Sequence, residues 1–127
     1  MNRSDMMRFG GLLSLVGMTI AADYAKKSPD QIASDVKAGK AVILDVREQT
    51  EWDEGHLDQA KSLPLSTIQE SKGKLDKANL FPEGKKVYLH CKSGIRCLKA
   101  ANLLEKQGIK TEAIKAPYDD LKKAFAN

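Results

Sequence analysis

Two short runs of residues constrain the fold of this chain more than any other feature of its sequence. Residues 41–46 form a continuous apolar run, and residues 86–91 form a second strong strand pattern around Val87, Tyr88 and Leu89. Continuous apolar runs of this length are typical of strands that are buried on both faces of a sheet. We therefore expect both runs to lie in the interior of one sheet.

The segments around these two runs predict helices that alternate with strands. Ser28 is suited to cap a helix that ends before Gly39, with Pro29 in the first turn and Gln31 completing a capping box. The further predicted helices are 47–54, a short one from Ser66, 95–107 and 118–126; the further strands are 60–63 and 111–114; residues 73–84 are predicted as loop. This alternation predicts an α/β fold, a three-layer domain whose mainly parallel sheet is flanked by helices.

Length and charge narrow the classes of function. A chain of 127 residues supports one domain with a single hydrophobic core. The net charge of +4 is modest, and the basic residues are spread along the chain instead of forming one tract with aromatics. We therefore expect no nucleic-acid partner, whereas small anionic substrates suit the basic balance.

The first 22 residues differ from the remainder. Arg3 and Arg8 precede 14 residues without any charge, 9–22, which end in the small residues Ala21 and Ala22. This order is typical of a secretory signal, so we predict a signal peptide at 1–22, a folded domain at 23–127 and a periplasmic or secreted protein. The alternative is a retained membrane anchor, although the apolar stretch is shorter than the roughly 20 residues that span a bilayer as a helix.

The most chemically informative segment is the loop that follows the second strand. Residues 91–96 read CKSGIR and lead into a predicted helix. A thiol at Cys91 would face backbone N–H groups, the positive end of a helix dipole and the guanidinium of Arg96. All three favour a thiolate and any anion beside it. Ligands of α/β sheets bind beyond the carboxyl ends of the strands, so Asp45 and Arg47 are expected near the same pocket.

Here the chain resembles the rhodanese family. The matching pieces are LDVRE at 44–48, EWDEGHL at 51–57, PL at 64–65 and CKSGIR at 91–96, in an order that spans about residues 28–126. The resemblance implies a thiosulfate or persulfide sulfurtransferase. In that family a loop cysteine takes sulfane sulfur from the donor, holds it as a persulfide and passes it to a thiol or to cyanide.

Carried onto this sequence, the resemblance makes Cys91 the nucleophile. The backbone N–H groups of the loop would cradle the persulfide, and Arg96, with Lys92, would hold the anionic donor. The implied substrate-binding residues are Arg96, Lys92, Ser93, Gly94 and Ile95. The implied partners are a small anionic sulfur donor and a thiol or cyanide acceptor; we expect no cofactor and a monomer.

Loop length distinguishes this chemistry from that of cysteine phosphatases. Four residues separate Cys91 from Arg96, whereas phosphatases of this general layout enclose five. The shorter loop suits a single sulfur atom better than a phosphate. The loop also contains no aspartate that could protonate a leaving alcohol, so we expect neither phosphatase nor arsenate-reductase activity.

Several other marked residues have structural interpretations. We expect Asp45 and Arg47 to form an ion pair or cap that supports the pocket by fixing the strand end. His56 is expected to hydrogen-bond the neighbouring loop, and Trp52 to pack in or near the core. His90 should face away from Cys91, because successive side chains on a strand alternate. The histidines and cysteines do not form a convincing metal set.

Cys97 leaves a question open. It directly follows Arg96, where the family commonly carries a small residue, and it is either a small buried side chain or a resolving thiol that forms a disulfide with Cys91. Two alternatives to a sulfurtransferase follow: a thiol-redox protein that uses both cysteines, or a sulfur-carrier or interaction module without turnover. The sequence also departs from the family at Ala116–Pro117, where a Gly-Gly pair is common, which leaves the pocket shape and acceptor open.

Overall fold

A parallel sheet forms the middle layer of the protein, as the two strand patterns predict. The computed structural model describes residues 22–127, so the predicted signal at 1–22 lies outside the described residues apart from Ala22. The four strands pair in the order β3-β2-β4-β5, and all neighbours are parallel. Their bounds are β2 Ala41–Asp45, β3 Ala60–Ser62, β4 Lys86–His90 and β5 Glu112–Ala113.

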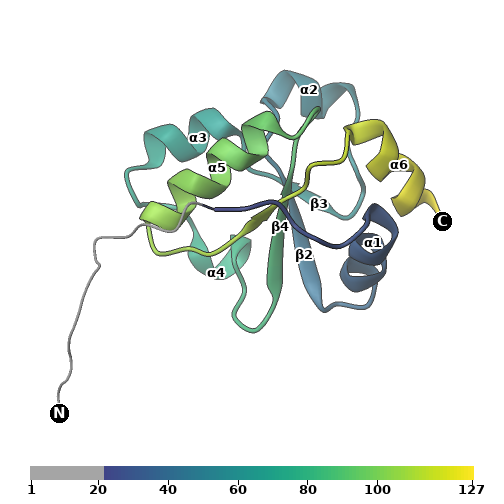
Figure 1. Cartoon of the computed structure of the whole chain (residues 1–127). Helices are drawn as coiled ribbons and strands as arrows, with labels where there is room; N and C mark the ends of the chain where they lie inside the picture. Colours follow the sequence, from purple (N-terminus) through teal and green to yellow (C-terminus); the bar gives the residue numbers. More distant parts are fainter. Residues whose placement is uncertain (1–21) are drawn as a thin grey trace, which may run out of the picture.

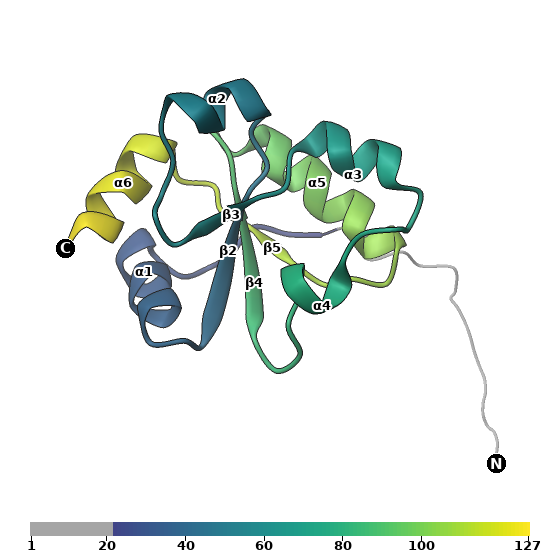
Figure 2. The same ribbon diagram turned by 180° about the vertical axis from the view of Figure 1, so that it is seen from behind.

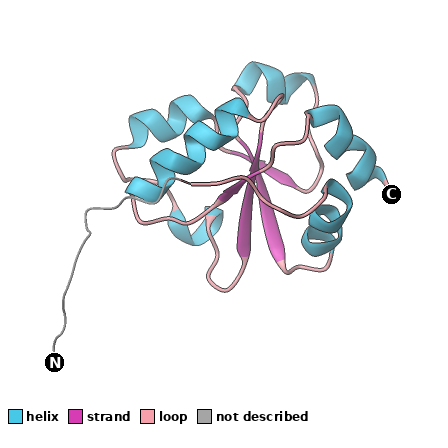
Figure 3. Ribbon diagram, viewed as in Figure 1, coloured by secondary structure: helices cyan, strands magenta, loops and turns pink. Residues whose placement is uncertain are grey.

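Helices cover both faces of this sheet, which confirms the three-layer α/β fold (Figures 1 and 3). The view from behind shows α1 and α6 together on one side and α3, α4 and α5 on the other (Figure 2). The helix α2 lies at the end of the sheet toward which the strands run. The bounds are α1 Pro29–Lys37, α2 Gln49–Glu54, α3 Leu65–Ser71, α4 Lys77–Leu80, α5 Ile95–Lys106 and α6 Tyr118–Ala126.

The alternation of side chains along the central strands divides the core in two. Leu44 and Leu89 pack with α3 and α5 on one face, whereas Ile43 and Tyr88 pack with α1 and α6 on the other. All four side chains are essentially inaccessible to water. Burying an aliphatic side chain of this size stabilises the fold by about 1.5–3 kcal/mol. The two central strands are therefore held from both sides, which fixes the position of the loop that follows β4.

The structure confirms the predicted start of the first helix and contradicts the predicted loop at residues 73–84. Ser28 and Gln31 form the predicted capping box of α1. The prediction of an uninterrupted loop over residues 73–84 is wrong, because α4 lies within it. The Asp76 side chain accepts a hydrogen bond from the Asn79 N–H, which caps this single turn. Within residues 22–127, none of the helices combines the length and apolar character needed to cross a membrane.

The segment before α1 runs along the free edge of β5. Tyr24 pairs with Ala113 in a parallel bridge, and the Ala25 N–H donates to the Ala113 carbonyl at 2.7 Å. The Ala22 N–H donates to the Asn102 side chain at 2.8 Å. These bonds anchor the start of the described chain beside α5, close to the loop that carries Cys91.

Candidate active site

Cys91 lies directly beyond the end of β4, at the carboxyl edge of the parallel sheet. Asp45, the last residue of β2, is in register with His90, so the ends of the two central strands meet as expected. Cys91 is only 1% exposed, and its side chain belongs to the core between the sheet and α5. The thiol is therefore at the floor of the loop formed by residues 91–96.

Backbone N–H groups converge on the sulfur of Cys91. The Gly94 N–H donates to Sγ at 3.1 Å and the Cys97 N–H donates at 3.3 Å. Gly94 reaches this position with φ at +92°, and a Cβ there would lie 2.8 Å from the Lys115 carbonyl oxygen. Because that conformation and that gap suit only glycine, the N–H cradle depends on Gly94.

The carbonyl groups of the loop are held on its outer side. The Tyr118 N–H donates to the Lys92 carbonyl at 3.0 Å, and the Tyr24 hydroxyl donates to the Gly94 carbonyl at 2.9 Å. Tyr24 lies 70 positions from Gly94 in the sequence. These two bonds hold the carbonyl oxygens of the loop on its outer side. They therefore favour the loop conformation in which N–H groups of the loop point inward, toward Cys91.

These contacts favour the thiolate form of Cys91. The neighbouring Cys97 side chain is the largest cause that lowers the pKa of Cys91; burial opposes it, and the N–H groups of Cys97, Gly94 and Ser93 lower the pKa further, to about 5. The sulfur also sits at the N-terminus of α5, where the helix dipole stabilises negative charge. At neutral pH Cys91 is therefore ionised.

Cys97 has the opposite environment. Its side chain is fully buried, with Sγ 3.2 Å from the Ile114 carbonyl oxygen and 3.4 Å from that of Gly94. The neighbouring Cys91 thiolate and burial raise the pKa of the Cys97 thiol far above the ordinary value. Both cysteines are free. Cys97 thus stays protonated, and its S–H donates to the carbonyl oxygen of Ile114.

Arg96 makes an ion pair that the sequence analysis did not anticipate. Its Nη1 and Nη2 donate to the two carboxylate oxygens of Glu51, at 2.5 Å and 2.9 Å. The hydrogen bond from Arg96 is the main cause that lowers the pKa of Glu51 to about 2. Glu51 belongs to α2 and precedes Arg96 by 45 positions in the sequence. The only sequence signal for Glu51 was that it belongs to the EWDEGHL motif.

The other loop side chains face outward. Lys92 and Ser93 are exposed, and Ile95, at 73% exposed, is the exposed large hydrophobic side chain of residues 22–127. These three side chains are therefore accessible to solvent on the outside of the loop. Arg96, by contrast, is partly buried against α2.

Asp45 and Arg47 form the structural pair that the sequence predicts. The Arg47 Nε donates to both carboxylate oxygens of Asp45 at 3.0 Å, and its Nη2 donates to Asp45 at 2.8 Å and to the Gly55 carbonyl at 2.7 Å. The guanidinium stacks 4.2 Å from the centre of the Tyr118 ring. Asp45 ends β2, Gly55 follows α2 and Tyr118 begins α6, so the pair connects these three elements.

The two histidines lie outside the cradle. His90 faces away from Cys91, as expected, 3.7 Å from Asp45 and stacked near Tyr118, and burial lowers its pKa to about 4. His56 contacts the preceding helix α2 instead of a neighbouring loop: its Nδ1 lies 2.9 Å from the Trp52 carbonyl oxygen, and the two rings stack at 3.6 Å. Among residues 22–127, no group of three or more His, Cys, Asp or Glu side chains is placed to hold a metal ion.

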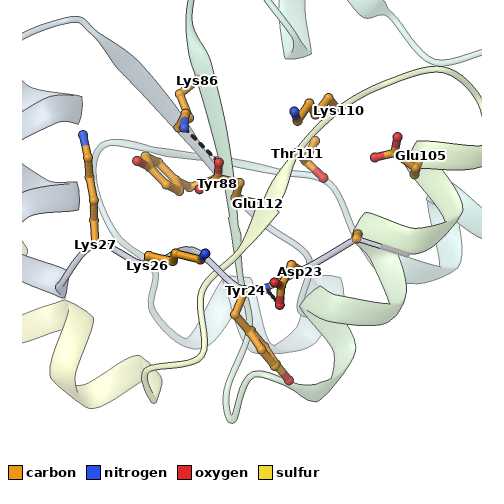
Figure 4. A pocket seen from close by; sticks show the side chains of 11 residues that line it. Asp23, Tyr24, Lys26, Lys27, Lys86, Tyr88, Glu105, Lys110, Thr111 and Glu112 are labelled. Atoms are coloured by element: carbon orange, nitrogen blue, oxygen red, sulfur yellow. Dashed lines mark hydrogen bonds and ion pairs between the residues drawn. The ribbon is translucent and has the colours of Figure 1, made fainter. Parts of the chain in front are cut away.

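A cavity of about 490 Å³ lies along the β5 edge, away from this loop (Figure 4). It is lined by the ion-paired side chains of Lys86 and Glu112 and by Tyr88, while the Tyr24 ring points away from the cavity. Tyr88 precedes Cys91 by three strand positions, or roughly 10 Å. None of the predicted site residues lines this cavity, so the chemistry of the loop is separate from it.

Comparison with known proteins agrees with this geometry. The Rhodanese-like domain family model matches residues 28–116. The tRNA uridine(34) hydroxylase of Protochlamydia amoebophila is 36% identical over 76 residues, which are 58% of this chain and 24% of that protein. The probable adenylyltransferase/sulfurtransferase MoeZ of Mycobacterium tuberculosis is 35% identical over 92 residues, 69% of this chain and 22% of that protein.

The chain thus spans about a quarter of the length of these two relatives. Among solved structures, the human single-domain sulfurtransferase TSTD1 matches with a TM-score of 0.60 and 21% identity, covering 76% of this chain and 97% of that one. This structural likeness shows the fold, and the match to the family model covers the segment that contains Cys91. The chain therefore belongs to the family of rhodanese-like domains.

Proposed function

We propose that this protein is a sulfurtransferase that carries sulfane sulfur on Cys91. The observation that supports this most strongly is the ionised sulfur of Cys91 beneath the N–H groups of Gly94 and Cys97, with a pKa of about 5. A thiolate is the nucleophilic form of cysteine, so the reaction needs no separate general base. The family relatives include a probable sulfurtransferase, which agrees with this chemistry.

The proposed cycle has two displacements at sulfur. The Cys91 thiolate attacks the outer sulfur of thiosulfate or of a persulfide, the S–S bond of the donor breaks, and sulfite or a thiolate leaves with the electron pair. An acceptor thiolate or cyanide then attacks the outer sulfur of the Cys91 persulfide, and the Cys91 thiolate is restored. The inward N–H groups stabilise the anionic sulfur in both states, as oxyanion-hole donors do.

Cys97 fits a supporting role in this cycle. Its high pKa keeps it protonated, and a protonated thiol is a poor nucleophile. We therefore favour a one-cysteine cycle over the thiol-redox alternative. A carrier without turnover remains the competing non-enzymatic function, and export to the periplasm or beyond remains a prediction from residues 1–22.

Turnover assays on the purified chain test the proposal. Thiocyanate formation from thiosulfate and cyanide, and sulfide release from glutathione persulfide and a thiol, are measured for the wild type, Cys91→Ala and Cys97→Ser. We expect turnover with at least one donor, its loss in Cys91→Ala and its retention in Cys97→Ser. Persulfide formation without turnover would favour the carrier, and failure with every donor would overturn the sulfurtransferase.

A further inference from the structure

The positive charge that this loop offers to an anionic donor is largely neutralised by the protein itself. Both terminal nitrogens of Arg96 donate to Glu51, which fills one of the edges with which a guanidinium binds an oxyanion through two parallel hydrogen bonds. Glu48 adds further negative charge beside the guanidinium. Lys92 is then the remaining cation of the loop, and it is exposed to screening by solvent.

Building on the proposed function, we infer that Glu51 is a specificity-determining residue that makes the site prefer persulfides of low charge over thiosulfate. The carboxylate of Glu51 already takes the place in which the sulfonate oxygens of thiosulfate would meet the two terminal nitrogens of Arg96. A persulfide has no such oxygens to place, so it loses nothing when Arg96 is occupied.

The charge balance of the two reactions leads to the same preference. With thiosulfate, a thiolate and a dianion combine, and a persulfide anion and the sulfite dianion result, so three negative charges are held together at the loop. With a protonated persulfide, the Cys91 thiolate takes the outer sulfur, the donor S–S bond breaks and a thiolate leaves, so the reacting sulfur atoms carry one negative charge throughout. Like charges within a few ångströms in a partly desolvated site raise the barrier of the first reaction more than that of the second.

Glu51→Gln tests this inference with little structural disturbance. The variant removes the charge but keeps an oxygen for the Glu48 N–H, which Glu51 accepts at 3.0 Å at the start of α2. Glu54→Gln is the matched control, because Glu54 is an exposed carboxylate on the same helix. The readout is kcat/KM for thiosulfate and for glutathione persulfide with one common acceptor.

We expect the wild type to favour glutathione persulfide, and Glu51→Gln to shift the ratio of the two kcat/KM values toward thiosulfate by about tenfold, the size of one charged hydrogen-bonded interaction. The change should reside mainly in the KM for thiosulfate, and Glu54→Gln should leave the ratio unchanged. An unchanged ratio in Glu51→Gln, or a wild-type preference for thiosulfate, overturns the inference while the sulfurtransferase stands.

A measurement on the wild type makes the test independent of the variant. Sulfate is an unreactive dianion that resembles thiosulfate, and we expect it not to compete with glutathione persulfide at constant ionic strength. Competitive inhibition by sulfate would contradict the role of Glu51. Absence of sulfur transfer from both donors is a different outcome, because it overturns the proposed function as well.

Discussion

Replacement of Cys97 by alanine should raise the pKa of Cys91. The surroundings of Cys91 lower that pKa from an ordinary 9.0 to about 5, with the Cys97 side chain as the largest cause. This lowering of the pKa corresponds to about 5 kcal/mol in favour of the thiolate, and several neighbouring groups contribute to it. Because one polar contact to a charged group contributes about 1.5–3 kcal/mol, loss of the Cys97 side chain should raise the pKa of Cys91 by about one to two.

The rate of alkylation by iodoacetamide as a function of pH measures this pKa, with intact mass used to count the modified thiols. The wild type should show a midpoint near pH 5, Cys97→Ala a higher one, and Cys97→Ser one close to that of the wild type, since a hydroxyl keeps a polar group at this position. A wild-type midpoint near the ordinary value of 9.0 would refute the role of the loop N–H groups. Equal midpoints in all three proteins would refute the role of Cys97.

The same ionisation has a consequence for folding stability. Between about pH 5 and pH 9 the unfolded chain keeps the Cys91 proton and the folded protein does not, so stability rises with pH and is lost as pH falls through the folded pKa. The free energy of unfolding of the wild type, relative to Cys91→Ser, should increase by about 1.4 kcal/mol per pH unit in this window. Urea unfolding at several pH values measures it, and a flat difference would contradict an ionised Cys91.

Three substitutions test the supports of the loop, each by urea unfolding together with the alkylation rate of Cys91. Gly94→Ala should destabilise the protein by about 1–3 kcal/mol and slow alkylation, because the new Cβ meets the Lys115 carbonyl and φ is +92°; an unaffected variant would disprove the tight approach. Tyr24→Phe should cost about 1 kcal/mol by removing the bond to the Gly94 carbonyl, and full stability would show that bond to be unimportant. Asp45→Asn should cost about 3–5 kcal/mol, because it leaves the buried Arg47 charge without its partner; a loss below about 1 kcal/mol would contradict a buried pair.

Local sequence signals sufficed for the features that depend on neighbouring residues. The apolar run at 41–46 and the strand pattern at 86–91 predicted the central strands, and therefore the placement of Cys91 at the carboxyl edge of the sheet. The spacing of Ser28 and Gln31 predicted the start of α1. These signals are short-range, so a single sequence contains them completely.

Features that depend on packing between distant segments were not predictable in this way. The Glu51–Arg96 pair and the Tyr24–Gly94 bond join segments that only the finished fold brings together. From the sequence alone, the Glu51 and Arg96 side chains could equally have faced solvent, because the pattern of charged residues does not specify which charges pair. The resemblance to rhodaneses implied that Arg96 holds the donor, whereas the structure places its guanidinium against Glu51.

The mass of the chain after exposure to a persulfide donor tests the central claim most directly. Lys92 and Arg96 separate Cys91 from Cys97, so trypsin places the two cysteines on different peptides. The persulfide cycle predicts a gain of one sulfur atom on the Cys91 peptide, removed again by an acceptor thiol and absent in Cys91→Ala. A gain confined to the Cys97 peptide, a loss of two hydrogens that joins both peptides, or no change in mass would contradict it.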